Sequence, residues 1–110
     1  PDVLGATKDG IYFTTELKVT KSNKVNLSPH QIAYHEERKN SCAFILVKRL
    51  LKSNPKKSQL HIYGAEQVRE LADHGLKVPG LFAFDPINWS SVQKQLVILV
   101  RGRTRDQLIG

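Results

Sequence analysis

The alternating segment 11–20 constrains the fold of this chain more than any other stretch of its sequence. One set of alternate positions holds Ile11, Phe13, Thr15, Leu17 and Val19, and the other holds Tyr12, Thr14, Glu16, Lys18 and Thr20. Alternation with a period of two is typical of a strand with one buried face. We therefore expect the mostly apolar set to face the core, and Glu16 and Lys18 to point together out of the sheet on the other face.

A short loop ending in glycine connects this strand to an earlier one. The loop 8–10 (sequence KDG) separates segment 2–7 from segment 11–20, which predicts a β-hairpin. With a three-residue loop, Thr7 pairs with Ile11. A two-residue turn would shift the register by one residue and turn the side chains of one strand to the opposite face.

The three-residue loop brings two acidic side chains together. It places Asp2 opposite Glu16 with Cβ atoms about 5 Å apart, whereas the two-residue turn would place Asp2 opposite Leu17. Two carboxylates this close repel each other, and a divalent cation resolves the conflict because Mg²⁺ binds carboxylate oxygens and retains several waters. Lys18 lies on the same face, where it can hold a metal-bound water or stabilise charge on a phosphate. For Glu16 and Lys18 taken alone, a surface ion pair is the simpler interpretation.

The rest of the chain alternates between helix and strand signals. Ser28, followed by Pro29 and Gln31, has the form of a capping box at the start of a helix. The further expected elements are a helix over 29 to about 39, a buried strand over 42–47, a strand over 59–63, a helix over 65–74 capped by Gly75, loops over 21–26 and 79–86, and a segment over 93–100 that is either strand or helix. Since 110 residues allow one domain, this order predicts an α/β or α+β sandwich around a small mixed sheet.

An excess of basic residues indicates a polyanionic partner. Seventeen Lys and Arg against ten Asp and Glu give a formal charge of +7, which favours nucleic acid first and an anionic membrane second. A single cysteine excludes an internal disulfide framework and a cysteine-rich zinc site, and the four histidines lack the spacing of metal ligands. Because there is no run of 18 apolar residues and no signal peptide, we expect no membrane span and a cytoplasmic location, in the host cytoplasm if the source is viral.

Together these residues resemble the signature of the PD-(D/E)XK nuclease superfamily. Pro1-Asp2, a strand, a tight turn and then Glu16-Leu17-Lys18 follow the superfamily pattern, and the helix start at 28–31 resembles the element that carries a glutamine to the active site. The VRR-NUC and phage-type Holliday junction resolvase branches look closest, over residues 1 to about 50. The resemblance implies a restriction-endonuclease-like core and Mg²⁺- or Mn²⁺-dependent hydrolysis of DNA, structure-specific for branched or junction substrates.

The resemblance also implies a role for each residue of the motif. Asp2 and Glu16 would ligate the metal ion, helped by the backbone carbonyl of Leu17. Lys18 would position or activate the attacking water, and Gln31 would orient Lys18, the water or the phosphate. A capping role at its own helix start is an equally good interpretation of Gln31.

Basic residues near this motif are candidates for contacts with DNA. Lys21 and Lys24 lie in the loop after the strand, which we expect to be a flexible clamp. His35 and Arg38 share the helix of Gln31 and form either a substrate-facing wall or part of a solvated helix surface. Phosphate contacts of this kind give sequence-independent affinity that falls with salt, and the sequence carries no motif for reading bases.

The sequence departs from the superfamily pattern at its start. The superfamily core begins with a helix and a strand before the PD motif, whereas this sequence begins at the motif. We therefore expect a truncated N-terminus, missing elements that are unnecessary, or a partner chain that supplies them. An unprotected sheet edge would favour a homodimer. Alternative functions are a non-catalytic nucleic-acid-binding module on the same fold and a purely structural or assembly domain.

Overall fold

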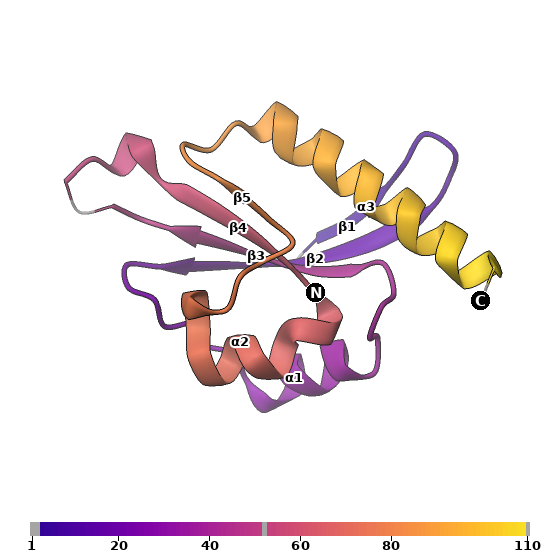
Figure 1. The fold of residues 1–110 in the computed structure, drawn as a ribbon, viewed down its shortest axis with the longest axis horizontal. Coiled ribbons are helices and arrows are strands. Elements are labelled where there is room, and N and C mark those ends of the chain that lie inside the picture. Colours follow the sequence, from indigo (N-terminus) through magenta and orange to yellow (C-terminus); the bar gives the residue numbers. More distant parts are fainter. Residues whose placement is uncertain (1–2, 52, 110) are drawn as a thin grey trace.

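The computed structural model describes residues 3–51 and 53–109, which form a five-stranded mixed sheet with helices on both faces (Figure 1). The strands are β1 (Val3–Ala6), β2 (Tyr12–Thr20), β3 (Ala43–Arg49), β4 (Gln59–Gly64) and β5 (Phe82–Phe84), side by side in this order. β2 and β3 are parallel, and the other neighbouring pairs are antiparallel. One face is covered by α1 (Pro29–Glu36) and α2 (Val68–His74), and the other by α3 (Trp89–Ile109). The expected mixed sheet of an α/β fold is confirmed.

The loop between β1 and β2 has three residues. The Thr7 amide donates to the Ile11 carbonyl (2.9 Å), and the Gly10 amide donates to the Thr7 carbonyl (3.0 Å). Gly10 has a φ of 83°, a left-handed conformation that glycine adopts without steric cost. These contacts are those of a three-residue hairpin loop that ends in glycine.

The register of the hairpin follows from this loop. Leu4 stands opposite Thr14, as the three-residue loop predicts, so the two-residue turn is excluded. The prediction that Asp2 stands opposite Glu16 uses the same register, but Asp2 lies outside the described residues.

Both faces of β2 are covered to some extent, which corrects the expected burial of this strand. Glu16 and Lys18 share one face, as the alternation predicts, but α1 and α2 cover that face and Glu16 is only 3% exposed. On the other face, Phe13 packs into the cluster beneath α3, whereas Leu17 and Val19 are 42% and 57% exposed. The alternation separates the two sets of side chains, but helices far along the chain decide which set is covered.

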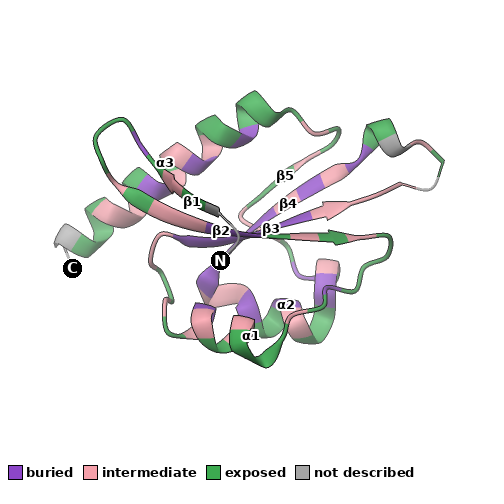
Figure 2. Cartoon of the chain, turned by 180° about the vertical axis from the view of Figure 1, so that it is seen from behind, coloured by how far each residue is buried: buried purple, intermediate pink, exposed green. Residues whose placement is uncertain are grey.

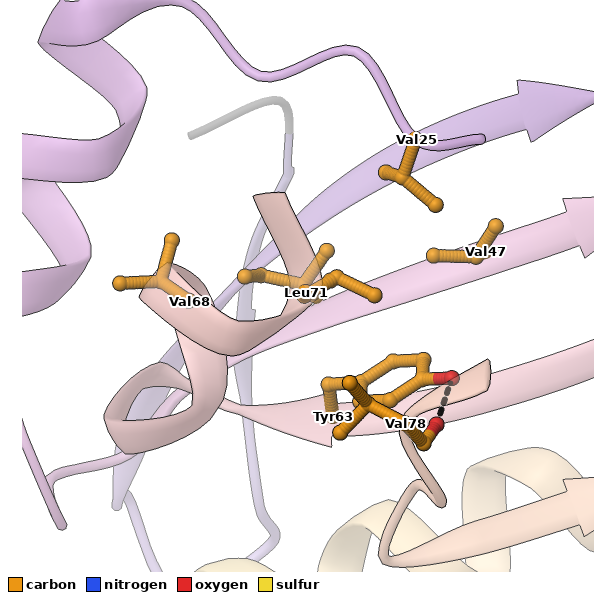
Figure 3. Packing of buried hydrophobic residues seen from close by; sticks show 7 residues of the cluster. Val25, Val47, Tyr63, Val68, Leu71 and Val78 are labelled. Carbon is orange, nitrogen blue, oxygen red and sulfur yellow. Dashed lines mark hydrogen bonds between the residues drawn. The ribbon is translucent and has the colours of Figure 1, made fainter. Parts of the chain in front are cut away.

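The face beneath α1 and α2 carries a hydrophobic core (Figure 3). Its buried members are Val25, Ile45, Val47, Tyr63, Val68, Leu71 and Val78. The Tyr63 hydroxyl donates to the Val78 carbonyl (2.7 Å), and burial raises the pKa of Tyr63, so the phenol keeps its proton. This hydrogen bond fixes the segment after α2 against β4.

Segment 93–100 is part of a helix. Val92, Leu96 and Val100 are buried at intervals of four residues and pack against the sheet from the side opposite α1 and α2. Figure 2 shows that exposed residues alternate with the buried ones along α3. Within the described ranges, no helix combines the length and apolar character that a bilayer span requires.

Several other boundaries differ from those expected, and two of the differences are substantial. α1 ends at Glu36 rather than near residue 39, and β5 lies within segment 79–86, where a loop was expected. A three-residue strand is too short to show alternation. Its pairing with β4, rather than its own sequence, makes this segment a strand.

A charged contact joins α3 to the other helical layer. Arg103 donates to both carboxylate oxygens of Glu66 (2.7 and 2.6 Å) and to the Ser41 carbonyl (3.1 Å). Burial alone would raise the pKa of Glu66, but the hydrogen bonds and charge of Arg103, together with backbone hydrogen bonds, outweigh it and the pKa lies below its usual value. The pair is therefore ionised at neutral pH and fixes the end of α3 to the turn before α2.

Replacing Gly102 with alanine is expected to raise the free energy of unfolding by about 0.5–1 kcal/mol. Gly102 lies within α3, and a Cβ atom there would meet no atom within 4 Å. Alanine therefore gains helix propensity without a steric cost. Urea unfolding followed by circular dichroism measures the change, and a loss of stability in this variant would contradict the helical placement of Gly102.

Candidate functional site

Glu16 and Lys18 form the centre of the candidate site. They lie one pleat apart on β2, where the parallel pairing with β3 sets Glu16 beside Ile45 and Lys18 beside Val47. Glu16 is buried under the helical layer, and Lys18 is half-buried. The carboxylate therefore lies deeper than the amine, which can reach a group that approaches from the surface.

His35 lies beside the Glu16 carboxylate. Its Nε2 atom is 4.0 Å from Glu16 Oε1, and its side chain has no exposed surface. Burial, reinforced by the nearby Arg38 guanidinium, lowers the pKa of His35 to about 4, so the imidazole is uncharged at neutral pH. Neither ring nitrogen has a hydrogen-bond partner within the described part of the chain.

The burial of His35 corrects its predicted place on a surface of α1. Both sequence interpretations, a wall facing the substrate and a solvated helix surface, require an exposed side chain. Ile32, one helical turn earlier, packs against the core, and residues three apart lie on the same side of a helix. The three-residue spacing from Ile32 therefore indicated that His35 is buried, whereas the polarity of histidine favoured an exposed position.

Gln31 caps its own helix, as one of its two interpretations predicts. The Ser28 hydroxyl accepts from the Gln31 amide (3.2 Å), and Gln31 Oε1 accepts from the Ser28 amide (3.0 Å). Gln31 nevertheless lies near Lys18, since both line a surface pocket of about 550 Å³. The other lining residues are Lys24, Val25, Asn26, Leu27, Ser28 and Ala72. The cap thus fixes the side chain of Gln31 at the edge of this pocket.

The loop that carries Lys21 and Lys24 is anchored. The Asn23 carbonyl accepts from the Leu76 amide (2.7 Å), and Val25 is buried in the core beneath α2. The expectation of a flexible clamp is therefore corrected to an anchored loop with two exposed lysines. Lys24 also lines the pocket of Lys18, whereas Lys21 does not.

Arg38 is held along α1. Its guanidinium lies 3.7 Å from the centre of the Tyr34 ring and donates to the Tyr34 carbonyl (2.9 Å). The Tyr34 hydroxyl in turn donates to Thr14 Oγ1 (3.3 Å). Tyr34 thereby connects α1 to the start of β2. Arg38 remains partly exposed, and its predicted contact with DNA stays a prediction.

Part of the donor set for a divalent ion is present in the described residues. Glu16 supplies a carboxylate, and His35 supplies a neutral imidazole with a buried nitrogen close to it. Within the described ranges, no group of three or more His, Cys, Asp or Glu side chains could hold a metal ion. The predicted third donor, Asp2, lies outside these ranges, and the role of the Leu17 carbonyl stays a prediction. The two donors are of the types that first-row divalent cations accept.

Comparison of the chain with protein-family models, with curated proteins and with solved structures gave no match.

Proposed function

We propose that this chain is a metal-dependent deoxyribonuclease with a restriction-endonuclease-like core, which hydrolyses phosphodiester bonds in branched or junction DNA. The observation that carries the proposal is the placement of a buried carboxylate, Glu16, and a lysine, Lys18, on one face of β2 beside a basic pocket. Beside an amine and an open pocket, a buried carboxylate suits metal-assisted hydrolysis.

The order of elements supports the same proposal. β1, a tight loop, β2 and then α1 with Gln31 near its start follow in the order that the PD-(D/E)XK resemblance implies. The hairpin register is also the one from which the proximity of Asp2 and Glu16 is predicted. The hairpin, its register and the position of α1 therefore all support the proposal of a nuclease core.

The residues of the site would divide the reaction between them. Asp2, Glu16 and the Leu17 carbonyl would hold Mg²⁺ or Mn²⁺, which supplies Lewis-acid stabilisation and activates a bound water. Lys18 would orient the attacking water and offset negative charge that develops on the phosphate. Gln31, fixed by the helix cap, would contact Lys18 or the phosphate from the edge of the pocket.

The charge of the chain supports DNA as the substrate. The formal charge is +7, Lys21 and Lys24 are exposed in the loop after β2, and Lys24 lines the pocket. Lysines of this kind contact phosphates and carry no information about base sequence. We therefore expect recognition of DNA shape.

A cleavage assay on branched, flapped and linear DNA tests the proposal. We expect product in the presence of Mg²⁺ or Mn²⁺ and none with EDTA, because the buried carboxylate needs the metal to activate water. Denaturing electrophoresis of end-labelled strands measures the product. Tight, salt-sensitive binding without product in either metal would contradict the proposal and favour a non-catalytic DNA-binding module.

A further inference from the structure

The imidazole of His35, which has no hydrogen-bond partner among the described residues, is the observation that the proposed function leaves unexplained. His35 is completely buried, and neither ring nitrogen forms a hydrogen bond to any described residue. A buried polar group without a partner costs about 1–3 kcal/mol, and such groups in folded proteins usually serve a bound water, an ion or a catalytic step. A structural role would favour an apolar side chain at this position.

The surroundings of the imidazole indicate what it could bind. The Tyr34 ring packs against it in a T-shaped arrangement, with ring centres 5.1 Å apart. Glu16 Oε1 lies 4.0 Å from Nε2, too far for a hydrogen bond. Two donors bound to one ion by bonds of about 2.1 Å lie about 3.0–3.4 Å apart, so an approach of less than about 1 Å would let one ion contact both atoms.

We propose that His35 supplies a nitrogen ligand to the divalent ion held by Glu16 and that the site consequently prefers Mn²⁺ to Mg²⁺. This inference rests on the proposed function, because it takes Glu16 as a metal ligand. Mg²⁺ favours an all-oxygen shell, whereas first-row transition ions accept imidazole as well as carboxylate. The imidazole would then select among the ions that can occupy the site.

Pulsed electron paramagnetic resonance of bound Mn²⁺ tests the ligand directly, without a measurement of cleavage. Protein labelled with ¹⁵N-histidine is titrated with Mn²⁺, and electron spin echo envelope modulation detects a histidine nitrogen bound to the ion. We expect a nitrogen coupling in the wild type and its loss in His35→Gln. His30→Gln is the matched control, since His30 is exposed on the same helix and should leave the coupling unchanged.

Affinity provides a second measurement. Mn²⁺ affinity is expected to fall about 10-fold or more in His35→Gln, with a smaller change in Mg²⁺ affinity, because only the transition ion gains from the nitrogen. Competition of the two ions, followed by the free Mn²⁺ signal, gives both values.

The outcomes separate the two proposals. Bound Mn²⁺ without nitrogen coupling, or coupling that persists in His35→Gln, would overturn the role of His35 and leave the nuclease proposal in place. Absence of Mn²⁺ binding together with absence of cleavage would overturn both. If His35→Gln does not fold, the role of His35 is tested with the labelled wild type and the variants His30→Gln, His61→Gln and His74→Gln. Loss of the nitrogen coupling in any of these three variants would assign the bound nitrogen to another histidine and overturn the proposal.

Discussion

DNA cleavage is expected to fall by about 10²- to 10⁴-fold when Lys18 is replaced by alanine or Glu16 by glutamine. Lys18 is the one basic residue of β2, and it lines the pocket on the same face of the strand as Glu16. Lys18→Ala removes this cation. Glu16→Gln keeps the shape of a buried side chain but removes the negative charge that would hold the metal ion. Both variants should bind DNA nearly as well as the wild type, because the exposed lysines of the neighbouring loop are unchanged.

Two surface substitutions provide controls for these variants. Glu37→Gln neutralises an exposed acid beyond the end of α1, and Lys94→Ala removes an exposed lysine from α3 on the other face of the sheet. Both should cleave at the wild-type rate. Single-turnover cleavage and fluorescence anisotropy measure the rate and the binding separately, and thermal unfolding shows whether each variant is folded. Wild-type cleavage by a folded Glu16→Gln or Lys18→Ala variant would refute the assignment of the site.

The parts of the fold that were predictable from sequence depend on local chemistry. A loop of fixed length sets the hairpin register, and the Ser28–Gln31 capping box starts α1 where the sequence indicates. The segment that forms β3 is buried because it begins with five consecutive apolar residues, so both faces of the strand carry apolar side chains. In each case the residues that determine the structure lie within a few positions of one another.

The parts that were not predictable depend on contacts between distant segments. Glu16 is buried because α1 and α2 pack over its face of the sheet, and nothing within segment 11–20 specifies that packing. His35 occupies an inward position of α1 that polarity alone would assign to solvent. The helical form of segment 93–100 likewise follows from the burial of every fourth residue against the sheet, since its apolar run fits a strand equally well. The candidate site was therefore identifiable as a motif, but its depth and the buried position of His35 beside Glu16 were not.

Replacing Gly75 with alanine is expected to lower the free energy of unfolding by about 3 kcal/mol or more. Gly75 has a φ of 61° and a ψ of −144°, a conformation that only glycine adopts readily. A Cβ atom at this position would lie 2.0 Å from the Asn23 carbonyl oxygen. That oxygen accepts from the Leu76 amide (2.7 Å), so the substitution disrupts the hydrogen bond that anchors the loop of Lys24.

Gly10→Ala is the matched control for this effect. Gly10 also has a positive φ, of 83°, but an added Cβ would meet no atom within 4 Å. The control should therefore lose only about 1 kcal/mol, the cost of the left-handed conformation itself. Urea unfolding of both variants measures the difference, which reports the contact between Gly75 and Asn23. Equal stability of the two variants would show that the loop does not depend on this contact. Because Asn23 precedes Lys24 at the pocket, a Gly75→Ala variant that still folds should also bind DNA more weakly than Gly10→Ala.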